Sequence, residues 1–196
     1  QFWVHYQPVV SLRDERVVGF EALLRWVHPE RGEIPPDEFI PVAESTGLIN
    51  RLGAFVLRAA CAQMAAWRRE VPEARDLVIS LNVSPRQLEE QRMSSLISRV
   101  LRESGLPPGN LNIEITESLI MRDTRAASRF FEKLRSQGVR VAIDDFGTGY
   151  SSLGYLQRFP ADYLKVDRSF VSGEASASNR QIVKTIVDLA LNMEFR

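Results

Sequence analysis

The sequence predicts an α/β protein, a TIM-like (β/α) barrel whose first strand runs antiparallel to the second. Short runs rich in β-branched and apolar residues alternate with longer helical stretches, which is typical of a parallel sheet covered by helices. Most of these runs lack strict polar alternation, which indicates burial of both sheet faces. Only residues 13–16 separate the first two runs. A parallel crossover needs about a dozen residues, so this first pair is predicted to be antiparallel.

Six runs are predicted as strands, because turn residues bound each of them. They are 4–12, 17–26, 77–83, 111–116, 139–146 and 163–166. Apolar periodicity and capping residues predict the helices. They are 39–44, 53–70, 85–103, 123–137 and a last one from 179 through 189. A (β/α)₈ barrel takes about 250 residues, so we expect its last two strands to be missing from this sequence and to follow Arg196.

The composition is that of a globular domain, with 44% hydrophobic and 26% charged residues. Lys+Arg and Asp+Glu both number 25, and this zero net charge argues against a DNA or RNA polymer as partner. A small phosphate ligand is still compatible with a net charge of zero, because a metal ion can bind phosphate without a positive field over the whole protein. The single Cys61 excludes an internal disulfide, and no apolar run could span a membrane. We expect one domain over 1–196, cytoplasmic or the cytoplasmic part of a membrane-anchored protein.

Acidic and amide side chains recur at the ends of the predicted strands. They are Glu21, Asn82, Glu114, the pair Asp144 and Asp145, and Asp167 beside Lys165. An ionised side chain in an apolar strand is costly to bury unless it is paired or metal-bound. In a barrel these strand ends converge on the face where active sites lie. Such oxygen ligands favour Mg²⁺ or Mn²⁺, and two ions about 3.5–4 Å apart, with Asp144 bridging, could support phosphodiester hydrolysis.

Each of these residues also has a simpler structural explanation. Asp144 and Asp145, followed by Gly-Thr-Gly, could form only a turn closed by local side-chain caps. Glu114 and Lys165 could form a buried ion pair. The whole set, in this order, favours a functional site over several independent structural features.

Seven segments together resemble the EAL domain family of bacterial signalling proteins. They are Tyr6-Gln7-Pro8, 19–26 with Glu21-Ala22-Leu23, 39–44 with 47–49, Asn82-Val83-Ser84, 114–118, 144–153 and 164–167. A bare Glu-Ala-Leu carries no information, but this order and spacing are specific and cover essentially the whole chain. The resemblance implies a phosphodiesterase that hydrolyses cyclic di-GMP to linear pGpG with two Mg²⁺ or Mn²⁺ ions, in signalling such as biofilm control.

The resemblance also implies roles for individual residues. One metal ion would be held by Glu21, Asn82, Glu114 and Asp144, and the second by Asp144 and Asp145. Lys165 would contact the attacking water, and Glu117 would anchor the loop that follows Asp145. Substrate contacts are expected from Gln7, Leu24, Arg25, Pro41 and Asp167.

Several expectations concern the rest of the protein. EAL domains continue with a strand carrying Val-Ala-Glu-Gly-Val-Glu and a later Gln-Gly segment, both beyond Arg196, and the first glutamate of that strand is a metal-site residue. The resemblance further implies a homodimer, with the loop after Asp145 near its interface, and flanking sensor or GGDEF domains. The alternatives are a receptor that binds cyclic di-GMP without cutting it, a fragment inactive through truncation, and an unrelated metal-dependent barrel phosphoesterase.

Overall fold

The structure is a computed structural model that describes residues 1–89, 92–148, 156, 159, 161–172, 177–193 and 195. Its strands are β1 (Phe2–Val10), β2 (Val17–His28), β3 (Gly32–Ile34), β4 (Val78–Asn82), β5 (Leu111–Thr116), β6 (Arg140–Phe146) and β7 (Tyr163–Val166). Its α-helices are α1 (Pro36–Thr46), α2 (Ile49–Glu70), α3 (Pro85–Glu89), α4 (Arg92–Ser104), α5 (Glu117–Arg122), α6 (Thr124–Ser136) and α8 (Ala177–Asn192). Three 3₁₀ turns are η1 (Pro72–Asp76), η2 (Pro108–Asn110) and η3 (Arg168–Phe170).

The strands form one sheet in the order β1-β2-β4-β5-β6-β7, with β3 paired to β2. β1 is antiparallel to β2, as the short connection predicts, and β2, β4, β5, β6 and β7 are parallel. Among the described residues no pairing joins β7 to β1, so the sheet is not closed. The predicted fold class, an α/β barrel with a reversed first strand and without closure, is confirmed.

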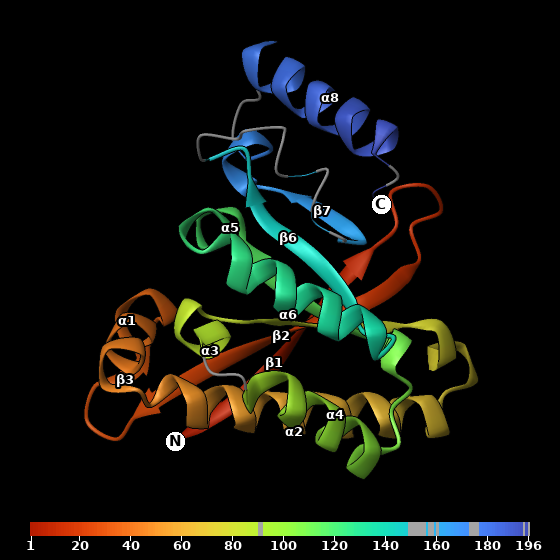
Figure 1. The fold of residues 1–196 in the computed structure, drawn as a ribbon. Helices are drawn as coiled ribbons and strands as arrows, with labels where there is room; N and C mark the ends of the chain where they lie inside the picture. The colour runs from red at the N-terminus through yellow and green to blue at the C-terminus, as the bar shows by residue number, and fades with distance from the viewer. Residues whose placement is uncertain are drawn as a thin grey trace.

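Helices cover the sheet on the side away from its inner face. α2 and α4 lie side by side beneath the first strands, α6 lies along β6, and α8 lies beyond β7 (Figure 1). The apolar side chains between these layers are fully buried, among them Leu57, Met64, Ile79, Ile113 and Phe131. Cys61 is part of this core, and its burial raises the pKa of the thiol to about 12.

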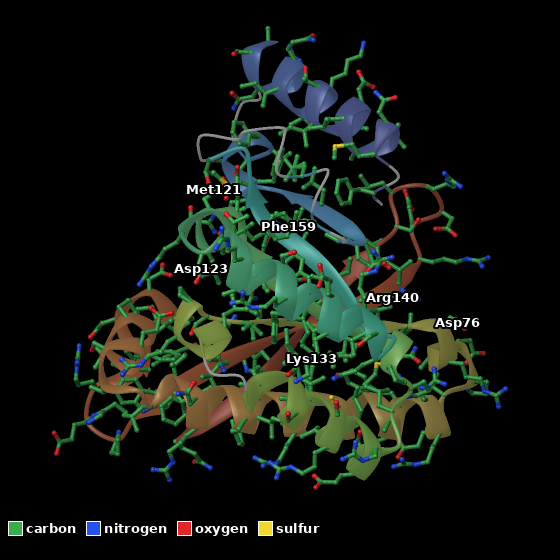
Figure 2. The ribbon with its side chains drawn as sticks, in the orientation of Figure 1. Asp76, Met121, Asp123, Lys133, Arg140 and Phe159 are labelled. Atoms are coloured by element: carbon green, nitrogen blue, oxygen red, sulfur yellow. The ribbon has the colours of Figure 1, made fainter. Side chains whose placement is uncertain are left out.

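The ends of α6 show why it begins and stops where it does. The Asp123 side chain accepts a hydrogen bond from the Ala126 amide at 2.9 Å, at the end of α6 near α5 (Figure 2). Gly138, with φ +80°, follows the helix and donates its amide hydrogen to the Arg135 carbonyl. The predicted cap and stop are therefore both present.

The structure corrects several predicted boundaries. β3 and α5 were not predicted, because a three-residue strand and a helix of less than two turns carry little periodicity. The helix predicted over 85–103 is described as α3 and α4, with residues 90–91 outside the described part. α1 extends beyond 39–44 in both directions and includes Pro41. No helix in the described part of the chain is long and apolar enough to cross a membrane.

One glycine allows the sheet to form around the site. A Cβ on Gly19 would lie 2.4 Å from the Val78 carbonyl oxygen, closer than real Cβ atoms approach. Gly19 therefore lets β2 pair tightly with β4, and this pairing sets Glu21 opposite Ser80.

Candidate active site

Polar side chains from five neighbouring strands meet on the inner face of the sheet. The register pairs Glu21 with Ser80, Asn82 with Glu114, and Thr116 with Asp144. Because these strands are parallel, their carboxyl ends lie along the same edge. The sequence-predicted ligands Glu21, Asn82, Glu114 and Asp144 are brought together there.

The Lys165 ammonium lies at the centre of this group. Its Nζ donates to Asp144 Oδ2 at 2.9 Å, forms a short ion pair with Glu114 Oε2, and lies 3.6 Å from Glu21 Oε2. Asn82 Nδ2 donates to Glu21 Oε1 at 2.7 Å. The buried Glu114–Lys165 ion pair, the simpler explanation considered for these two residues, is therefore present within a larger cluster.

Burial and charge act in opposite directions on these groups. The Glu114 side chain is 3% exposed, and this burial raises the pKa of its carboxyl, while the Lys165 charge acts to lower it. Burial alone would lower the pKa of Lys165, but the charges of Glu114 and Asp144 outweigh it and raise that pKa. Lys165 is therefore a stable cation that compensates several carboxylates at once.

Asp144 and Asp145 form a tight turn at the end of β6. Asp145 has φ +54°, its amide donates to Asp144 Oδ1 at 2.9 Å, and Thr148 Oγ1 donates to the Asp145 carbonyl at 3.0 Å. These are the local caps that a simple turn would also show. Burial and the negative charges of Asp144 and Asp167 raise the pKa of Asp145.

The Asp145 side chain is hydrogen-bonded to that of Asp167, the partly exposed residue that follows β7. Hydrogen bonds from Ser169 lower the pKa of the Asp167 carboxyl. The pKa values of the two carboxyls are therefore shifted in opposite directions, upward for Asp145 and downward for Asp167. Two of the predicted site residues are thus joined at the rim of the cluster.

Glu117 begins α5 and is 1% exposed. Its Oε2 accepts a hydrogen bond from the Gly147 amide at 3.0 Å, so it ties the end of β5 to the turn after β6. Gly147 has φ +100°, a conformation that favours glycine. This is the contact that loop anchoring by Glu117 requires, although 149–155, the rest of the predicted loop, lie outside the described residues.

Only some of the residues expected to contact substrate lie on the same face as the carboxylates. Gln7 is exposed and lies directly across from Glu21 on β1, so the two side chains share a face. Arg25 lies on that face of β2, with its Nη1 bonded to the Leu24 carbonyl at 3.0 Å. Leu24 packs instead against the hydrophobic core, and Pro41 lies exposed within α1. The structure therefore does not bring the Leu24 side chain to the cluster.

The donor chemistry of the cluster fits a hard divalent cation. Carboxylate oxygens of Glu21, Glu114 and Asp144 already surround one positive charge, the Lys165 ammonium. In the described part of the chain no three acidic, histidine or cysteine side chains are spaced to hold an ion as they stand. In this structure the carboxylates are arranged around the Lys165 ammonium.

Comparisons with known proteins show the family to which this chain belongs. The EAL domain family profile matches residues 1–196, and the chain belongs to that family. An uncharacterized signaling protein of Caulobacter vibrioides is 47% identical over 97% of this chain and 23% of its own length.

MucR of Pseudomonas aeruginosa, a bifunctional diguanylate cyclase/cyclic di-GMP phosphodiesterase, is 43% identical over 100% of this chain and 28% of its own length. A solved structure of the PaMucR phosphodiesterase in complex with c-di-GMP is 42% identical, with a TM-score of 0.94. That match covers 100% of this chain and 78% of the solved one. The chain thus spans roughly a quarter of the length of the two curated relatives named here.

The structure adds two residues that the sequence interpretation missed. Ser80 and Asn112 are buried polar residues directly beneath the carboxylates. Asn112 precedes Glu114 by two positions on β5, and strand alternation places both side chains on one face. An amide two residues before a predicted metal ligand, inside an apolar run, was the available signal.

Proposed function

We propose that this chain hydrolyses cyclic di-GMP to linear pGpG with the help of divalent metal ions. The observation that carries the proposal is the convergence of Glu21, Glu114 and Asp144 from separate parallel strands on one cationic centre. The likeness to MucR, a protein named as a cyclic di-GMP phosphodiesterase, supports the choice of substrate.

The metal ions would be Mg²⁺ or Mn²⁺, since the ligands offered are carboxylate and amide oxygens. Glu21, Asn82, Glu114 and Asp144 would hold one ion, and Asp144 with Asp145 would hold the second. When bound, such ions activate water near neutral pH and neutralise charge on a phosphodiester.

The chain's own residues would bind and orient the reactants. The Arg25 guanidinium, on the same face as Glu21, suits a phosphate because its planar fork can donate two parallel hydrogen bonds. Gln7 and Pro41 are exposed and available to the substrate. Lys165, held as an ammonium, would donate a hydrogen bond to the attacking water and keep it in line with phosphorus. Asp167, whose side chain contacts that of Asp145, would support the site at this position.

The proposal is tested by incubating the protein with cyclic di-GMP and Mn²⁺ or Mg²⁺ and separating the nucleotides by chromatography. Glu21→Ala and Asp144→Asn should abolish pGpG formation while melting curves show folded protein. Binding of cyclic di-GMP is measured in parallel by calorimetry. Tight binding without pGpG would support the receptor alternative, and neither binding nor product would reject cyclic di-GMP as the ligand.

A further inference from the structure

A buried polar network lies directly beneath the carboxylate cluster. Ser80 on β4 and Asn112 on β5 are paired across the two strands, and they are 8% and 4% exposed. Arg140, at the start of β6 (Figure 2), is the partner of Asn112 on the other side. The opposite face of β5 carries the fully buried Ile113 and Ile115. A polar layer in such a strand needs a reason, because burying polar groups is costly.

The Asn112 amide makes two hydrogen bonds within this network. Its Nδ2 lies 3.0 Å from Ser80 Oγ and 3.2 Å from Glu114 Oε1. An amide nitrogen carries two hydrogens, so both are used. Turning the amide over would bring its oxygen against a carboxylate oxygen, so these contacts fix its orientation.

The two oxygens of Glu114 therefore have different partners. Oε1 is held from below by Asn112, while Oε2 faces the centre, where it pairs with Lys165. The carboxylate cannot rotate about its last bond without losing the Asn112 contact. Glu114 is thus presented to the centre through a single oxygen.

Stability alone does not explain an asparagine at this position. Asn112 Oδ1 is buried and has no hydrogen-bond partner among the described residues. An apolar side chain of similar size would remove that unsatisfied acceptor. The two donated hydrogen bonds are what asparagine provides and an apolar residue does not.

We propose that Asn112 is a positioning residue that fixes the Glu114 carboxylate in the orientation required for metal binding. This inference rests on the proposed function, because it takes Glu114 as a metal ligand. Hydrogen bonds to a ligating side chain commonly change metal affinity by about 10–100-fold. Asn112 acts on the ion only through Glu114.

The test measures Mn²⁺ affinity by calorimetry, without substrate, on the wild-type protein and on Asn112→Leu and Asn112→Ser. Leucine has no donor, and the shorter serine does not reach Glu114. Both variants should bind Mn²⁺ about tenfold or more weakly. Ser80→Ala leaves the Glu114 contact in place, so its affinity should stay close to that of the wild type.

A matched control is Asn110→Ala. Asn110 is also buried, but its Nδ2 donates to the main-chain carbonyls of Arg75 and Leu77, away from the carboxylates. This variant should lose thermal stability and keep its Mn²⁺ affinity. A folded Asn112 variant with wild-type Mn²⁺ affinity would overturn the positioning role and leave the proposed function standing. A wild-type protein that neither binds Mn²⁺ nor forms pGpG would reject both.

Discussion

Replacing Lys165 with methionine tests whether the ammonium occupies the position of a metal ion. Methionine keeps much of the side-chain volume and removes the charge. In the wild-type protein Nζ lies 2.9 Å from Asp144 Oδ2 and 3.6 Å from Glu21 Oε2, and it is paired with Glu114. Without it, several carboxylates, one of them almost fully buried, lose their compensating charge.

The size of the effect follows from the burial of the two partners. Removing one member of a fully buried ion pair costs about 3–5 kcal/mol. Lys165 is 34% exposed, so water screens part of the lost interaction and we expect about 2–3 kcal/mol. For a chain of this length each kcal/mol lowers Tm by about 2–4 °C, which predicts a loss of about 4–12 °C without metal.

Mn²⁺ should then stabilise Lys165→Met more than the wild type, because no ammonium competes with the ion. Thermal melting with and without Mn²⁺ measures both effects, and the variant should form no pGpG. Lys184→Met, on the exposed face of α8, is the matched control and should change stability by less than about 0.5 kcal/mol. If the metal-free variant is as stable as the wild type, or if it gains no stability from Mn²⁺, the ammonium does not occupy the position of a metal ion.

Two further predictions concern the scaffold. Gly19→Ala should lower the free energy of unfolding by about 1–3 kcal/mol in urea titrations, because its Cβ would meet the Val78 carbonyl. Gly109→Ala, where a Cβ finds almost open space, should be close to neutral, and equal losses would contradict the crowding at β4. The buried Cys61 thiol has its pKa raised from 9.0 to about 12, so the folded state keeps a proton that the unfolded chain releases. Wild-type stability should therefore fall relative to Cys61→Ala as pH rises above about 9, by at most about 1.4 kcal/mol per pH unit. If the free energy of unfolding depends on pH in the same way in the two proteins, the Cys61 thiol does not contribute to that dependence.

Local patterns were sufficient to predict the sheet. The four-residue connection at 13–16 determined the antiparallel first pair, and β-branched runs located the parallel strands. β3 and α5 were not predicted, because elements this short leave no periodic signal in the sequence. The predicted helix 39–44 was too short at both ends, since α1 runs from Pro36 to Thr46.

The site was predictable in its members and less so in its contacts. Glu21, Glu114 and Asp144 were identified as polar residues at strand ends, and the structure brings them together. The central position of Lys165 depends on the curvature of the sheet, which spacing along the chain does not encode. Leu24 packs against the hydrophobic core through the alternation of β2, and its expected contact with substrate stays a prediction.

The most direct test of the central claim is the formation of linear pGpG from cyclic di-GMP with Mn²⁺. The wild-type protein should convert cyclic di-GMP to pGpG, with no product when the metal is chelated and none from folded Asp144→Asn. Absence of pGpG from folded, Mn²⁺-loaded wild-type protein would contradict the account.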